Sequence, residues 1–344
     1  MTTILSKLKA IAKHTLMPDK VSKPVTSFEP GTLPWIDKSG ADIDSFIKNY
    51  EPAQSLPYDL AEKMKFWKQN GYVILDQAIA TTWLDQLWSE VEELIENHEE
   101  YPINVRIDLP EYAAHPVMAI KDVPKEVLNG PYIKFLDFHD NSVIAKKIML
   151  HKNIVTFLGA VFGDKVIGMQ SLVFKYGSQQ ATHQDFAYVV SEIPSHLAAA
   201  WIALEDVHID SGPLFYYPGS HTVNKFNFGN GIFYNDKSTL HPGDFANYLD
   251  KVCLDAGLEK KTLLIKKGDV LLWHAALAHG GDEIRNSTLT RKSFVCHYSS
   301  SKAYRHHRQS PTAEPVRRTI NGADVFVNPT MPDQEDVFTV GKTL

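Results

Sequence analysis

The sequence predicts a mainly β fold with flanking helices, in which helices pack around a C-terminal β-barrel or β-sandwich. Two patterns predict this. Helical spacing of apolar residues dominates the N-terminal half, and from about residue 166 short apolar and aromatic runs alternate with turns rich in Gly, Pro and Ser. The chain has 344 residues, of which 44% are hydrophobic and 22% charged. These values are typical of one large globular domain with extensions.

We expect three segments along the chain. Residues 1–37 hold an amphipathic helix followed by an extended, proline-containing connector. Residues 38–310 form a single domain, with a helical part at 38–163 and the β-core at 164–300. Residues 311–344 form a C-terminal extension.

Three stretches of the N-terminal half are predicted helices: 59–70, 81–98 and 142–162, with a short strand at 71–76. Thr81 or Thr82 is placed to cap the second helix, whose stripe of Trp and Leu side chains is typical of a face that packs in a core. Strands are predicted farther along, at 167–176, 183–190, 197–208, 213–218, 262–265, 270–274 and 292–299.

Composition excludes several classes of protein. A formal net charge of −6 argues against a nucleic-acid surface, which needs a basic stripe. Cys253 and Cys296 cannot build a disulfide framework, so we expect a reducing, cytoplasmic compartment. No apolar run reaches the ~18 residues of a membrane span, and lysines interrupt the N-terminal stretch where a signal peptide would be apolar. Membrane contact through the N-terminal helix stays open, but docking on its own domain or on a partner is favoured.

The sequence His183-Gln184-Asp185 carries the first chemical signal. On a strand, residues i and i+2 point to the same face, so His183 and Asp185 would both point into a barrel. One imidazole and one carboxylate are two ligands of the two-histidine, one-carboxylate set that binds iron(II). The same spacing occurs in His208-Ile209-Asp210, but that pair precedes a turn and most simply faces solvent.

A third ligand is expected from a distant strand, where His274 and His279 are both candidates. His279 precedes two glycines, which permit close backbone approach to a bound ligand, whereas His274 ends an apolar run and suits a core. Beyond them, Arg291 begins a predicted strand, and its guanidinium can pair bidentately with a carboxylate. An exposed loop arginine is the alternative interpretation.

Taken together, these motifs resemble the phytanoyl-CoA dioxygenase family of non-haem iron(II), 2-oxoglutarate-dependent oxygenases. The resemblance runs in the family order across 166–298 and implies a double-stranded β-helix (a jelly-roll, cupin-like core). The matching motifs are His183-Gln184-Asp185, Trp201-Ile202-Ala203-Leu204-Glu205-Asp206, Gly212-Pro213-Leu214, Pro218-Gly219-Ser220-His221, Gly268-Asp269-Val270-Leu271, His279-Gly280, Asn286-Ser287 and Arg291.

The resemblance implies roles for individual residues. The iron ligands would be His183, Asp185 and His279. Arg291 would anchor the distal carboxylate of 2-oxoglutarate, Trp201 would line the cosubstrate pocket, and Gln170 matches a polar position that some members direct toward cosubstrate or substrate.

The sequence departs from the family pattern at two points, and four further histidines need an interpretation. Gly281 stands where the family often has a serine that helps to hold the distal carboxylate, and the interval from His279 to Arg291 is one residue longer than usual. We expect His221 to support a turn and His297 to pack in a strand. The pair His306-His307 is expected to be solvated, with coverage of the active site as the alternative.

The expected activity is hydroxylation of an aliphatic C–H, with release of succinate and CO2 from 2-oxoglutarate and O2. A carboxylate at position 185 argues against chlorination, because related halogenases have a small residue there; desaturation, epimerisation and cyclisation stay open. We expect a small metabolite or natural-product intermediate as substrate. Its candidate neighbours are Phe186, Tyr188, Tyr216, Tyr217, Lys134 and Arg106.

Two other classes of function are weighed. One is a non-catalytic β-barrel binding or scaffold protein that keeps the metal pocket. The other is a hydrolytic zinc site, which lacks a general base placed by a motif. The sequence leaves the substrate and the oligomeric state open.

Overall fold

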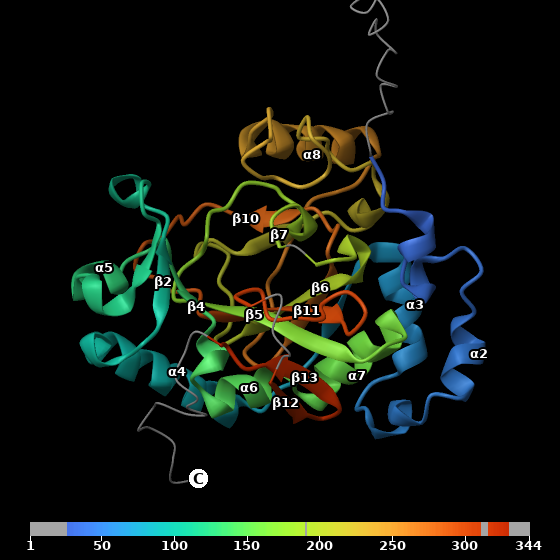
Figure 1. Ribbon diagram of the computed structural model, residues 1–344, viewed down its shortest axis with the longest axis horizontal. Coiled ribbons are helices and arrows are strands. Elements are labelled where there is room, and N and C mark those ends of the chain that lie inside the picture. Colours follow the sequence, from blue (N-terminus) through green and yellow to red (C-terminus); the bar gives the residue numbers. More distant parts are fainter. Residues whose placement is uncertain (1–25, 190, 311–315, 330–344) are drawn as a thin grey trace, which may run out of the picture.

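The computed structural model describes residues 26–189, 191–310 and 316–329 (Figure 1). The predicted N-terminal amphipathic helix lies outside the described residues. The connector that follows it is not extended throughout: its described part contains two 3-10 turns, Pro30–Thr32 and Trp35–Asp37. The indole N–H of Trp35 donates to the carbonyl of Ala160 at 2.8 Å, which fixes the second turn against the domain.

Strands of the described chain form two sheets that face each other. The large sheet has the order β1-β9-β6-β11-β5-β4-β2-β3, with β13 pairing with β5 and with β12, and the small sheet has the order β10-β7-β8. The strands are β1 (Tyr72–Leu75), β2 (Asn104–Ile107), β3 (Val117–Ala119), β4 (Ile133–Leu136), β5 (Val166–Phe174), β6 (Leu197–Ala203), β7 (Leu214–Tyr216), β8 (Lys261–Thr262), β9 (Val270–His274), β10 (His279–Gly281), β11 (Ser293–Ser300), β12 (Arg317–Ile320) and β13 (Ala323–Phe326).

This arrangement is the double-stranded β-helix that the sequence predicted, with helices around it. The helices are α2 (Ile43–Lys48), α3 (Leu60–Asn70), α4 (Thr81–Glu96), α5 (Lys125–Leu128), α6 (Val143–Met149), α7 (Lys152–Phe162) and α8 (Pro242–Asp255). Helices α3, α4, α6 and α7 lie along the outer face of the large sheet, whereas α8 lies beyond the small sheet (Figure 1). No helix of the described residues is long and apolar enough to span a membrane.

Alternation along the strands of the large sheet separates two apolar cores. In β6, Ala198, Ala200 and Ile202 face the helices, while Ala199 and Trp201 face the space between the sheets. The inner core also receives Leu214 and Tyr216 of β7. Fully burying a large apolar side chain contributes about 1.5–3 kcal/mol, so the helix layer and both sheets are held as one body.

Several predicted elements differ from the structure. The strands expected at 197–208 and 262–265 are shorter, at Leu197–Ala203 and Lys261–Thr262, and α4 is capped at Ala80, with no side-chain cap from Thr81 or Thr82. Two further differences have local reasons. The helix predicted at 142–162 is broken into α6 and α7, because the ring of His151 accepts the N–H of Asn153 and caps a new helix. The strand predicted at 183–190 is wrong: within the described part, 183–189, only His183 pairs, in an isolated bridge with His279, and the chain then turns in a 3-10 segment, Asp185–Ala187.

Candidate active site

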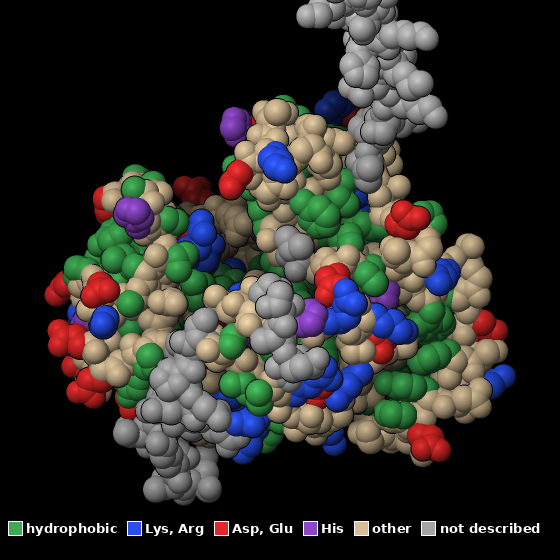
Figure 2. Space-filling model, viewed as in Figure 1, with side chains coloured by type: hydrophobic (Ala, Val, Ile, Leu, Met, Phe, Trp, Pro, Cys, Tyr) green, Lys and Arg blue, Asp and Glu red, His purple; other side chains and the backbone are tan. Residues whose placement is uncertain are grey.

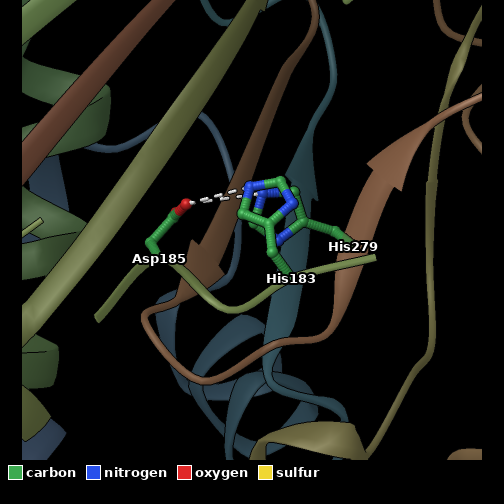
Figure 3. Close-up of side chains that lie close together, drawn as sticks. All are labelled: His183, Asp185 and His279. Carbon is green, nitrogen blue, oxygen red and sulfur yellow. Dashed lines mark ion pairs between the residues drawn. The ribbon is translucent and has the colours of Figure 1, made fainter. Parts of the chain in front are cut away.

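The side chains of His183, Asp185 and His279 converge between the two sheets (Figure 3). His279 begins β10, and His183 lies beside it because each residue donates its backbone N–H to the carbonyl of the other, at 2.9 and 3.0 Å. Asp185 begins the 3-10 turn and points back at both rings. The convergence expected from strand alternation is thus produced by one bridge and one turn.

The donor atoms of this set have the spacing of a metal site. Nε2 of His183 lies 3.6 Å from Oδ1 of Asp185, and Nε2 of His279 lies 3.5 Å from the same oxygen. All three ligand atoms lie within 4.8 Å of one another, and all three residues are buried. Among the described residues no other group of three or more His, Cys, Asp or Glu side chains meets this spacing.

Backbone contacts fix which nitrogen of each ring faces the site. Nδ1 of His183 lies 2.9 Å from the carbonyl oxygen of Ala181, and Nδ1 of His279 lies 3.0 Å from that of Leu277. A carbonyl only accepts, so each Nδ1 carries a proton, and Nε2 is the nitrogen of each ring that faces the site. Burial lowers the pKa of His279 to about 4 despite the neighbouring Asp185 carboxylate. The ring is therefore neutral at neutral pH, as a metal ligand must be.

Asp185 is an ionised carboxylate with its two oxygens in different surroundings. Burial alone would raise its pKa, but His279, His183 and His297 outweigh burial and hold the pKa of Asp185 well below its usual value. Oδ1 faces the two histidine ligand atoms. Oδ2 accepts the indole N–H of Trp273 at 2.7 Å and lies 3.5 Å from Nε2 of His297.

This donor set fits iron(II). Two neutral imidazoles and one carboxylate oxygen form the facial set that leaves further positions open, and it contains none of the thiolates that favour structural zinc. The outer oxygen of Asp185 is already hydrogen-bonded, so one oxygen is free to ligate.

Arg291 and Trp201 lie together in the inner core. Arg291 is 2% exposed, and its guanidinium carbon lies 5.4 Å from the ring centre of Trp201 and 5.9 Å from that of Phe174. Burial lowers the pKa of Arg291 to about 10, with Glu205 acting in the opposite direction, so it stays charged at neutral pH. Within the described chain, Nε of Arg291 and Nε1 of Trp201 have no hydrogen-bond partner. Two buried donors without acceptors suit an anionic ligand.

Three other candidate residues near the ligand set differ in their burial and in their contacts. Tyr216 is the register partner of His279 and lies in the inner core, with its ring tilted against that of Tyr72 and the ring centres 4.6 Å apart. The Tyr188 ring lies 6.1 Å from that of His183 and is 36% exposed. Gln170 of β5 is directed at His297, with Nε2 3.2 Å from Nδ1.

Phe186 and Lys134 have partners of their own. The ring of Phe186 is fully buried and packs edge-on against Phe28, 5.0 Å away, so we do not retain it as a substrate contact. Lys134 pairs with Asp108 at 2.8 Å, and Arg106 pairs with the other oxygen of Asp108 at 2.7 Å. Arg106 lies on β2 and Lys134 on β4. These two strands border a hollow in the surface between β2 and α8, with Lys and Arg side chains at its edge (Figure 2).

The remaining histidines mostly follow prediction. His274 is a core residue, 3.3 Å from Asp37, and His221 is half-buried, with Nε2 3.2 Å from the carbonyl oxygen of Lys68. One prediction is wrong: His307 is 6% exposed rather than solvated, because segment 301–310 folds back onto the barrel.

Gly281, which stands where the family often has a serine, has no room for a side chain. A Cβ at this position would lie 2.8 Å from the Ser178 hydroxyl.

Sequence reasoning missed the contacts of Trp273 and His297 with Asp185. Both lie on strands of the large sheet, and both were interpreted only as apolar-run or packed-strand residues. The alternation of side chains along the strands could have predicted these contacts. Trp273 of β9 and His297 of β11 both pair in register with Ala199, from opposite sides of β6. All three side chains therefore point into the barrel.

A buried two-histidine, one-carboxylate set inside a double-stranded β-helix defines the class of non-haem iron oxygenases. Within that class, residues 67–293 match the family model described as Phytanoyl-CoA dioxygenase (PhyH), and the chain belongs to this family. Iron(II), 2-oxoglutarate and O2 are the cofactor and cosubstrates of the family.

Individual relatives are distant. The chain is 22% identical over 258 residues to peroxisomal phytanoyl-CoA dioxygenase of Mus musculus, which covers 70% of this chain and 68% of the mouse protein. Two solved structures share the fold. The epimerase SnoN in complex with Fe3+, alpha ketoglutarate and nogalamycin RO has a TM-score of 0.53 and 18% identity, over 78% of this chain and 98% of SnoN. EctD from S. alaskensis with 2-oxoglutarate and 5-hydroxyectoine has a TM-score of 0.54 and 14% identity, over 83% and 87%.

Proposed function

We propose that this protein hydroxylates an aliphatic C–H of a small metabolite or natural-product intermediate, using iron(II), 2-oxoglutarate and O2. The observation that carries the proposal is the buried donor set of His183, Asp185 and His279, together with the buried Arg291, whose Nε has no hydrogen-bond partner among the described residues. The carboxylate at position 185 favours hydroxylation over chlorination. The likeness to SnoN, an epimerase, keeps other C–H oxidations as outcomes of the test.

The chain's own residues would bind and orient the reactants. Nε2 of His183, Nε2 of His279 and Oδ1 of Asp185 would hold the iron, and a set of three protein donors would leave further positions for cosubstrates. Bound iron supplies the oxidation of the C–H bond, coupled to the conversion of 2-oxoglutarate into succinate and CO2. Arg291 anchors the distal carboxylate of 2-oxoglutarate against the Trp201 ring, in a site from which protein side chains exclude water.

Tyr188 and Tyr216 are proposed to contact the substrate, on different grounds. Tyr188 is partly exposed beside His183 and so is accessible from solvent. Tyr216 lies in register with His279 on the inner face of the small sheet. Lys134 can contribute only if an acidic substrate group competes with Asp108 for it.

The test is conversion of 2-oxoglutarate into succinate by protein purified anaerobically and loaded with iron(II). We expect slow conversion without substrate and faster conversion with an accepted substrate, whose product carries one oxygen from 18O-labelled O2. Absence of both turnover and iron binding would support a scaffold protein instead. A product without the labelled oxygen would replace hydroxylation by epimerisation, desaturation or cyclisation.

A matched pair of histidine variants checks the ligand assignment. His279→Ala should abolish iron binding and succinate formation, because it removes a donor atom. His274→Ala removes a buried histidine only five residues earlier that contacts Asp37, so iron binding should be retained. The opposite result would transfer the ligand role to His274.

A further inference from the structure

The outer oxygen of Asp185 is contacted from two sides. The indole N–H of Trp273 on β9 donates to Oδ2 at 2.7 Å, and Nε2 of His297 on β11 lies 3.5 Å from the same atom. All three side chains are buried. The Trp273 contact is a hydrogen bond to a buried carboxylate, which is stronger than one between neutral groups, so it restricts rotation of the carboxylate; the His297 contact is longer and adds to this restriction.

The His297 contact continues toward the surface through Gln170. Nη1 of Arg308 donates to Oε1 of Gln170 at 3.3 Å, and Nε2 of Gln170 lies 3.2 Å from Nδ1 of His297. Arginine can only donate, so the amide oxygen of Gln170 faces Arg308 and its NH2 faces His297. Nδ1 of His297 must therefore accept, which places the ring proton on Nε2, toward Asp185.

Arg308 lies on segment 301–310, which follows β11. Its second guanidinium nitrogen pairs with Asp137, and its backbone N–H donates to the hydroxyl of Tyr304. The side chain of Arg308 is 36% exposed, whereas that of Asp137 is 17% exposed. The contacts thus connect a surface segment to the candidate iron ligand in three steps: Arg308 to Gln170, Gln170 to His297, and His297 to Asp185.

We infer that Trp273 and the series Arg308–Gln170–His297 are positioning residues that hold Asp185 as a single-oxygen ligand. This inference rests on the proposed function, because it takes Asp185 as an iron ligand. With Oδ2 held by the protein, Asp185 presents only Oδ1 to the metal, and the remaining positions stay available to 2-oxoglutarate and O2. Segment 301–310 contributes to this constraint although it contains no ligand.

The first experiment removes only the indole N–H. Trp273→Phe keeps an aromatic ring but loses the donor, and Trp67→Phe is a matched control, because Trp67 is 1% exposed and its Nε1 has no partner among the described residues. The probe is Co(II), titrated into the full chain. We expect Trp273→Phe to weaken Co(II) affinity by about 10–100-fold, as for partners that orient metal ligands, and to change the Co(II) d–d spectrum as Oδ2 joins the coordination.

The second experiment tests the connection through His297 with a double-mutant cycle. Arg308→Ala and His297→Phe should each weaken Co(II) affinity, and Arg308→Ala should have little additional effect when His297 is already Phe. Additive losses would mean that Arg308 acts by another route. Arg308→Lys, which restores a donor, should recover part of the affinity.

The outcomes separate the inference from the proposed function. If the unmodified protein does not bind Co(II), or if Asp185→Ala binds it equally well, the iron-site assignment fails. If the unmodified protein binds Co(II) but Trp273→Phe matches Trp67→Phe in affinity and spectrum, the assignment stands and the positioning role is wrong. Thermal unfolding of Trp273→Phe and Trp67→Phe shows whether any loss of Co(II) affinity reflects unfolding of the protein instead.

Discussion

The chain contains two His-x-Asp sequences with opposite environments. In His183-Gln184-Asp185 the imidazole and the carboxylate are about one tenth exposed, at 11% and 8%, and Nε2 of the ring faces the carboxylate. In His208-Ile209-Asp210 they are 56% and 39% exposed, and Nδ1 of the ring faces the carboxylate at 3.8 Å. In the second sequence Nδ1 is also the acceptor of the backbone N–H of Asp210.

The difference shows what a two-residue spacing cannot specify. A metal site needs each ring turned so that its outer nitrogen is free, and in the buried pair the carbonyls of Ala181 and Leu277 provide this. It also needs a third donor, which the bridge between His183 and His279 supplies. The exposed pair has an arginine neighbour instead, Arg285, 3.7 Å from Asp210.

The largest difference between the two pairs is expected from their aspartates. Asp185→Ala removes a ligand oxygen, so iron(II) affinity should fall by more than about 100-fold, beyond the effect typical of a partner outside the ligand set. Asp210→Ala removes an exposed carboxylate and should change affinity less than about twofold. Anaerobic iron titration measures both, and equal losses would contradict the distinction between the pairs.

The two arginines near these pairs sharpen the comparison. Arg291→Met leaves the carboxylate of 2-oxoglutarate without its buried partner, which costs about 2–5 kcal/mol, so the KM for 2-oxoglutarate should rise by at least about 30-fold. Arg285→Met alters an exposed ion pair with Asp210 and should leave this KM nearly unchanged. A small effect of Arg291→Met would place the distal carboxylate elsewhere.

The last expected effect is on stability in acid rather than on ligand affinity, and it lies away from both pairs. Burial lowers the pKa of His139 to about 3, so this ring is neutral in the fold but becomes protonated in the unfolded chain below its ordinary value of 6.5. The unfolded state then binds more protons, and this contribution to stability is lost as the pH falls from about 6.5 toward 3, by up to about 1.4 kcal/mol per pH unit. Urea unfolding of metal-free protein should show this slope, and His139→Asn should reduce it.

Much of the site was predictable because its ligands lie in motifs with a fixed order along the chain. His183, Asp185 and His279 were predicted and are brought together by the structure. The local reason was wrong for Asp185, since one bridged residue and a 3-10 turn replace the expected strand. The donor atoms of His183 and Asp185 are nevertheless buried and close to that of His279, because the bridge between His183 and His279 fixes their position.

What the sequence did not predict depends on contacts between distant strands. The hydrogen bond from Trp273 to Asp185 depends on how β9 lies opposite the turn, which no local pattern encodes. Helix α8 was missed for a different reason. A capping box formed by His241 and Asp244 marks its start and was available in the sequence, but the pattern has histidine where serine or threonine is usual.

The bridge between His183 and His279 also bears on the order of events in folding. Two ligands separated by a long stretch of chain are paired through their own backbones, so a large loop must close before the donor set exists. The backbone bridge closes that loop, so the entropic cost of closure belongs to folding of the chain. We therefore expect the metal-free protein to fold with the bridge formed, and iron(II) added to refolded protein to bind.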